Sequence, residues 1–100
     1  MTIPELLSAL AELRGAIAQD IRVTKGAGGT QPLPADNVFV RQAAALGWET
    51  ESPPTIYGLL KAVEFAHAQI SIEVFRDGAS DTAGHMLAAM TASGTRSGTA

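Results

Sequence analysis

Glu64 and His67 are spaced so that they could bind one metal ion together. On a helix, residues three positions apart lie on the same face, so the carboxylate and the imidazole would point the same way. His67 also continues an apolar row formed by Leu60, Val63 and Ile70. A histidine in such a row is usually a hydrogen-bonded core or interface residue. Metal binding by Glu64 and His67 is therefore an alternative hypothesis and not the main one.

The Glu-x-x-His spacing resembles that of ferritin-like di-iron proteins, in which glutamates from neighbouring helices complete the site. This resemblance implies a metal-binding helical protein. The sequence holds no second Glu-x-x-His, so further ligands would have to come from Glu12, Asp20 or Glu73, or from a second copy. We therefore expect no cofactor. No serine lies in a Gly-x-Ser-x-Gly motif, and we expect no enzymatic activity.

Residues 36–64 contain a second candidate site, for DNA. The segment AAALG (residues 43–47) precedes a turn, and TIY (residues 55–57) follows it. The pattern partly resembles a helix-turn-helix, and the resemblance implies DNA binding through the helix after the turn. The connection has seven residues instead of the usual three or four. Gly58 and Leu59 also occupy positions where Arg, Asn or Gln would contact bases, so DNA binding is an alternative hypothesis.

The composition excludes several classes of protein. Hydrophobic residues make up 46% of the chain, which is typical of a folded domain. The net charge of −3 disfavours broad binding to phosphate backbones, so nucleic acid is not the expected partner. The chain has no cysteine, which excludes disulfides and thiolate chemistry. No apolar run approaches the length of a membrane span, and no signal peptide is visible, so we expect a cytoplasmic location without membrane contact.

Apolar periodicity predicts an all-α fold. Thr2 and Glu5 have the spacing of a capping box at the start of the first helix. The apolar residues that follow recur every three or four positions, as on one face of a helix. We expect a small four-helix bundle-like domain over residues 1–93, with two long and two short helices. The helices are predicted near 3–23, 36–46, 53–76 and 80–93.

Two segments are expected to lie outside the helices. Residues 26–34 are rich in glycine and proline, and they predict a flexible linker. Residues 94–100 have almost nothing to bury, and they predict a flexible polar tail.

Capping residues mark the starts of the later helices. The candidates are Asp36 or Asn37, then Ser52 followed by Pro53, then Ser80 or Asp81. Gly47 is the expected C-terminal glycine of the second helix. Alternating β-branched residues leave open whether residues 70–75 form helix or a short strand.

Helices of such unequal length cannot cover one another completely, and an uncovered apolar row favours binding to a partner. We therefore expect a non-catalytic interaction or assembly protein that self-associates or is a small subunit of a larger complex. A phage or other particle component assembled in the cytoplasm would fit this size. The expected partners are protein chains. The predicted interaction surface consists of Leu6, Leu10, Leu13, Ile17, Trp48, Tyr57, Leu60 and Val63.

Overall fold

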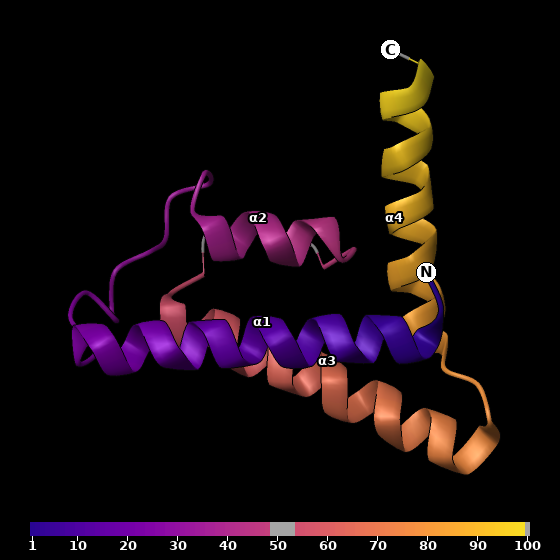
Figure 1. Cartoon of the computed structure of the whole chain (residues 1–100), viewed down its shortest axis with the longest axis horizontal. Coiled ribbons are helices and arrows are strands. Elements are labelled where there is room, and N and C mark those ends of the chain that lie inside the picture. The colour runs from indigo at the N-terminus through magenta and orange to yellow at the C-terminus, as the bar shows by residue number, and fades with distance from the viewer. Residues whose placement is uncertain (49–53, 100) are drawn as a thin grey trace.

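The computed structural model describes the backbone of residues 1–48 and 54–99 and the side chains up to Ala92. Over these residues the chain forms four helices and no strand, which confirms the all-α, bundle-like fold (Figure 1). The helices are α1 (Ile3–Thr24), α2 (Val38–Ala45), α3 (Ile56–Asp77) and α4 (Asp81–Thr99).

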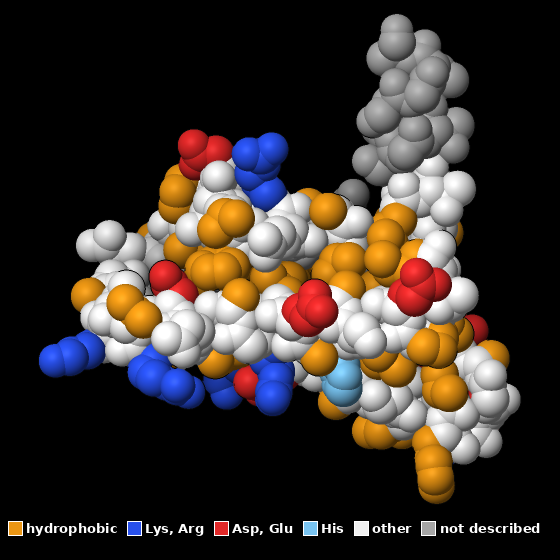
Figure 2. All heavy atoms as spheres, viewed as in Figure 1, with side chains coloured by type: hydrophobic (Ala, Val, Ile, Leu, Met, Phe, Trp, Pro, Cys, Tyr) orange, Lys and Arg blue, Asp and Glu red, His pale blue; other side chains and the backbone are white. Residues whose placement is uncertain are grey.

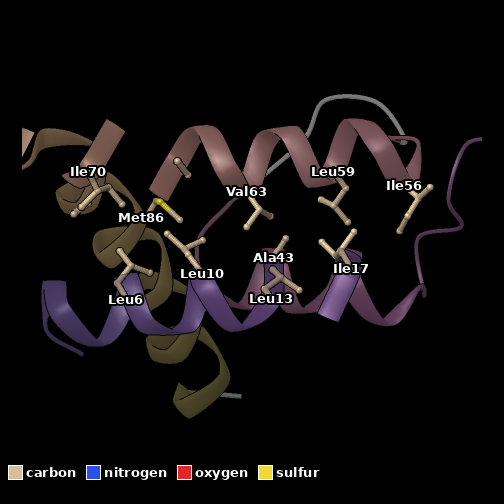
Figure 3. Close-up of a cluster of buried hydrophobic side chains, with 12 residues drawn as sticks. Leu6, Leu10, Leu13, Ile17, Ala43, Ile56, Leu59, Val63, Ile70 and Met86 are labelled. Carbon is tan, nitrogen blue, oxygen red and sulfur yellow. The ribbon is translucent and has the colours of Figure 1, made fainter. Parts of the chain in front are cut away.

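Helices α1 and α3 form the centre of the fold. They run antiparallel, so that Leu6 lies at the same end as Ile70, and Ile17 lies beside Leu59 (Figure 3). Each contributes one row of large apolar side chains, and these rows account for most of the core. Residues spaced by three and four positions make a continuous face on a helix, which is why the two rows can close on each other along their length.

The ends of α1 follow the local rules of helix capping. Thr2 Oγ1 accepts from the Glu5 amide, and the Glu5 carboxylate accepts from the Thr2 amide, so the predicted capping box is present. At the other end Lys25 adopts a left-handed conformation with φ 57°, and its amide bonds to the last turn. The helix therefore ends where the glycine-rich segment begins, as expected.

Helix α2 is short and packs along α1. Asn37 caps it, because its side-chain oxygen accepts from the amides of Phe39 and Val40. Ala43 is its buried residue, and Gly47, with φ +83°, follows its C-terminal end. Both the cap and the terminal glycine agree with the sequence prediction.

Helix α4 runs across the direction of α1 and projects from the body of the molecule (Figure 1). Only its first half reaches the core, through the buried residues Ala83 and Met86. The helix continues to Thr99, past the predicted end at Ser93. A single glycine such as Gly94 costs a helix only about 1 kcal/mol, so it need not end one.

The start of α3 also differs from the prediction. Thr55 is the cap, its hydroxyl accepting from the Gly58 amide at 3.0 Å, and the helix begins at Ile56. The predicted cap, Ser52, and Pro53 lie outside the described residues. Residues 70–75 are helical, which settles the choice between helix and strand.

The predicted linker, residues 26–34, is organised by turns and hydrogen bonds. The Leu33 amide donates to the Pro54 carbonyl at 2.8 Å, and the Leu33 side chain packs against the core. Gly29 is buried beneath the ring of Tyr57, where a Cβ atom would overlap the ring. This segment is therefore tied to the start of α3 at two points.

Among the described residues, no helix is both long enough and apolar enough to cross a membrane.

Candidate functional site

Most of the predicted interaction surface lies inside the protein. Five of its eight residues are at most 4% exposed: Leu6, Leu10, Leu13, Ile17 and Val63. They are covered by one another and by neighbouring α3 and α4 side chains (Figure 3). Because the rows on α1 and α3 face each other, they fill the core of a single chain and leave no external row at that position. This part of the prediction is corrected.

The other three predicted residues remain partly accessible. Leu60 and Trp48 are half-buried against the core, and Tyr57 is 43% exposed. One side of the Tyr57 ring is covered by Gly26 and Gly29 in the glycine-rich turns. Tyr57 therefore packs against the glycine-rich turns, whereas Leu60 and Trp48 pack against the core.

A different apolar face is open to solvent, on the outer side of α3. Phe75 is 91% exposed, Phe65 is 61% exposed and Ile72 is 51% exposed. Ile72 follows Phe65 by seven positions and Phe75 follows Ile72 by three, so all three lie on one side of the helix. Ala68, also exposed, lies between them on the same side. We call Phe65, Ala68, Ile72 and Phe75 the outer face of α3.

The outer face of α3 points away from the rest of the molecule. The buried α3 residues Leu59, Val63 and Ile70 lie on the opposite side of the helix, against α1. Figures 1 and 3 place α1, α2 and α4 all on that inner side. Figure 2 shows apolar side chains open to solvent around the C-terminal end of α3, at the lower right of the view. A partner could therefore reach the outer face without displacing another helix.

The sequence carried a signal for the outer face of α3. Ile70, Ile72 and Val74 alternate with polar residues, and this alternation left open whether the segment forms helix or strand. On the helix that forms, Ile70 is buried and Ile72 points outward. The apolar residues that fit a strand therefore belong to two opposite faces of one helix, and the second face continues through Phe65 and Phe75.

The described part of the chain does not complete a metal site around Glu64 and His67. Glu64 is exposed and His67 is half-buried on α3. Among the described residues, no group of three or more histidine, aspartate or glutamate side chains is placed to hold a metal ion. Glu73 lies further along α3 and is hydrogen-bonded to the start of α4. A metal at Glu64 and His67 would need ligands from outside the described part of the chain, and this hypothesis stays untested.

The packing of α2 and α3 weighs against the DNA-binding hypothesis. Helix α2 packs on α1, and the start of α3 is covered by the glycine-rich turns through Tyr57. Glu64 is exposed on the same helix, where it would repel phosphate. Most of the seven-residue connection, residues 49–53, lies outside the described residues, so the turn that this hypothesis requires stays a prediction.

A polar cluster joins the end of α3 to the start of α4. The Glu73 carboxylate accepts from the Ser80 hydroxyl at 2.6 Å, the Gln69 amide at 2.8 Å, and the Thr82 hydroxyl and amide at 2.9 and 3.1 Å. The Ser80 hydroxyl in turn accepts from the Ala83 amide at 3.0 Å. A carboxylate at a helix N-terminus is stabilised by the helix dipole and by the free amides there. Glu73 therefore fixes where α4 leaves the body.

These hydrogen bonds predict an acid-sensitive connection. Donation by Ser80, then by Gln69 and Thr82, lowers the pKa of Glu73 from 4.5 to about 2. Because the folded pKa lies below the unfolded value, Glu73 contributes stability that is present above about pH 4.5 and is lost as the pH falls towards 2. We expect Glu73→Gln to lower Tm at neutral pH and to reduce the fall in Tm between pH 5 and pH 2.

The measurement is Tm by circular dichroism across that pH range. The matched control is Glu64→Gln, which changes an exposed glutamate on the same helix. An acid dependence of Tm that is the same in wild type and in the Glu73→Gln variant would contradict the assigned role of Glu73.

Comparisons of the chain with protein-family models, with curated protein sequences and with solved structures gave no match.

Proposed function

We propose that this chain is a non-catalytic interaction protein that self-associates through the outer face of α3. The observation that carries the proposal is the exposure of Phe75, Phe65 and Ile72 at 91%, 61% and 51% on one side of a single helix. Single exposed apolar residues are common on soluble proteins, but contiguous patches of large apolar side chains mark contact sites.

The size of the patch supports a contact with another protein chain. An aromatic side chain buries roughly 150–250 Å², so the three exposed residues offer on the order of 400 Å² of apolar surface. A stable interface buries about 800 Å² per partner. The outer face of α3 supplies about half of that area, so a stable interface would also have to include exposed neighbours such as Lys61 and Arg76. Aromatic residues are also those that contribute most to binding energy in interfaces.

A second copy is the occupant that this surface fits best. The outer face of α3 is a straight row on a helix, and two such rows can pack against each other as the rows of α1 and α3 do inside the chain. A symmetric dimer uses the same surface on both partners, so one exposed row is enough to form it. The expected product is a homodimer with a dissociation constant on the order of micromolar.

The test is the solution mass of the purified chain as a function of concentration. We expect the mass to rise from monomer to dimer for the wild type, and Phe75→Lys to keep the chain monomeric at the same concentrations. Lysine at this exposed position leaves the core untouched, so the free energy of unfolding of the monomer should change by no more than about 0.5 kcal/mol.

Val23→Lys provides the matched control. Val23 is 69% exposed near the end of α1, so it has a comparable side-chain exposure but lies outside the outer face of α3. We expect this variant to dimerise like the wild type. A wild-type chain that stays monomeric at several hundred micromolar would overturn the proposed function. Equal loss of dimer in both variants would remove the outer face of α3 as the contact.

A further inference from the structure

The charges of α1 are divided between two flanks of the helix. Its acidic residues are Glu5, Glu12 and Asp20, and its basic residues, with the C-cap included, are Arg14, Arg22 and Lys25. At about 100° per residue, each set spans an arc of about 80°, and the two arcs lie on opposite sides of the buried row. Figure 2 shows basic side chains along the lower edge of the molecule and acidic ones over α1, on the side towards the viewer.

The charged side chains of α1 do not pair with one another along the helix. None of them has an oppositely charged side chain three or four positions away in the sequence. On an exposed helix, opposite charges at these spacings pair and stabilise it. Arg22 instead donates to the neutral Gln19 side chain, at 3.4 Å. Arg14, Arg22 and Lys25 are all exposed, which leaves their charges to solvent ions or to a partner.

The basic flank of α1 also carries a row of side chains at helical spacing. We call this row, at steps of four and three residues, the second row of α1: Leu7, Ala11, Arg14, Ala18, Ile21 and Lys25. Leu7 and Ile21 are half-buried against the edge of the core, and Ala11 is exposed. Large, small and cationic side chains therefore follow one another along about 27 Å of helix.

The second row of α1 lies away from the helices that cover the core. Helix α2 lies on the other flank, where Ala9 and Ala16 line a groove with Gln42 and Ala45 of α2. Figure 1 shows α4 rising on the same side of α1 as α2. In the described part of the chain, neither helix covers the exposed residues of the second row, so another chain can reach it.

The charges of α3 leave the basic flank of α1 basic. Because α1 and α3 run antiparallel, the exposed Lys61 and Glu64 lie level with the middle of α1. Their opposite charges offset each other. The three cations on α1 therefore keep an excess of positive charge, and the surface is complementary to an acidic partner.

We infer that the second row of α1 binds an acidic amphipathic helix of another protein. The apolar face of that helix would pack on Ala18 and Ile21, where the small alanine lets the two backbones approach. Lys25 follows Arg14 by eleven positions, about 16 Å along the helix, so carboxylates three turns apart would meet both cations. This site is separate from the outer face of α3 and does not depend on self-association.

Two other occupants fit the second row less well. In a second copy of this chain, the acidic flank of α1 is walled by α2, because Glu12 lines the groove that Gln42 closes on the other side. The basic flank lies on a layer two helices wide, so α2 would meet that layer before the two flanks came into contact. A phosphate backbone offers nothing to the apolar Leu7 and Ile21.

Two synthetic helical peptides of about 21 residues, roughly 30 Å long, test the site. Both carry the same leucine and alanine face, with glutamates beside it in one peptide and lysines in the other. Fluorescence anisotropy of a label on the peptide measures the dissociation constant. At low salt we expect the acidic peptide to bind at least about tenfold more tightly than the basic one, and added salt to reduce the difference.

Charge-reversed variants test whether the cations of α1 carry this preference. Arg14→Glu combined with Lys25→Glu should weaken the acidic peptide by about tenfold and strengthen the basic one. Arg14→Gln with Lys25→Gln should give a smaller loss in the same direction, and it provides the test if the reversed chain does not fold. The matched control is Arg41→Glu, which reverses an exposed cation on α2 and should change the affinity by less than about twofold. Circular dichroism checks that each variant keeps its helices.

Four results would each overturn the inference. The first is equal affinity of the two peptides, or no binding at several hundred micromolar. The second is an equal loss in the Arg41→Glu variant, which would show only a general attraction of negative charge. The third is a loss of affinity in a Phe75→Ala variant, which would place the peptide on the outer face of α3. The fourth is a DNA duplex that binds more tightly than the acidic peptide and loses affinity when Arg14 and Lys25 are reversed.

Discussion

Replacing Leu10 with alanine is expected to lower the free energy of unfolding by about 2–5 kcal/mol. Leu10 lies in the middle of the buried row of α1 and is 1% exposed. Its side chain points towards α3 and Met86 of α4, so it connects three of the helices (Figure 3). Truncation removes apolar contacts and leaves a cavity, because the paired helices cannot collapse around a single missing side chain.

Urea denaturation followed by circular dichroism measures this effect. A domain of this size is stable by about 5–15 kcal/mol, so the loss is a large fraction of the total. The midpoint should fall while the slope of the free energy against urea stays the same. Leu7→Ala is the control, because Leu7 is half-buried at the edge of the core and should cost clearly less. Equal losses for Leu7 and Leu10 would contradict the central position of Leu10.

The Leu10 prediction also separates folding from association. The sequence predicts most of the core row of α1 as a partner surface, whereas in the structure this row lies inside one chain. If they formed the dimer contact, the Leu10→Ala loss would depend on protein concentration. We expect the loss to be the same at all concentrations, whereas substitutions at Phe75 should act on the dimer alone.

The sequence predicted the helices from local signals. Thr2 and Glu5 indicated the start of α1, and Asn37 and Gly47 indicated the two ends of α2; the structure has the same caps there. Each of these signals acts within about one turn, through hydrogen bonds between a side chain and a nearby amide, or through backbone freedom at a glycine. Such signals can be read without knowing how the helices pack.

The contacts between distant segments could not be predicted from these local signals. The rows of α1 and α3 were correctly found, but whether they face each other or a partner depends on tertiary packing. The Glu73 carboxylate reaches Ser80 across the turn between α3 and α4, and no local motif joins the two positions. The Tyr57 ring covers Gly29 in a segment that its composition indicated as a flexible linker.

The outer face of α3 was missed for a physical reason. Helix α3 carries apolar residues on two opposite sides, so its hydrophobic pattern has no single period. Ile70 and Ile72 therefore fitted a strand as well as a helix. In the structure α1 covers the side of α3 that carries Ile70. Phe65 and Phe75 lie on the opposite side of α3, where nothing in the described part of the chain covers them. The same information supports the proposed partner surface.

Replacing Gly47 with alanine is expected to cost about 2–4 kcal/mol of stability, with two separate causes. Gly47 follows α2 with φ +83°, a conformation that costs a residue with a side chain about 1–2 kcal/mol. A Cβ at this position would also overlap the Met86 carbonyl and lie 2.9 Å from the Met86 Cα. These are backbone atoms within α4, and they cannot turn aside as a flexible side chain would.

The comparison with Gly78→Ala separates the two causes. Gly78 ends α3 with φ +72°, and a Cβ there would meet nothing within 4 Å. Alanine at position 78 should therefore show only the conformational cost, about 1–2 kcal/mol. The difference between the two variants, measured by urea denaturation, reports how closely the end of α2 is pressed against α4. Equal losses at positions 47 and 78 would mean that this close contact between α2 and α4 does not exist in solution.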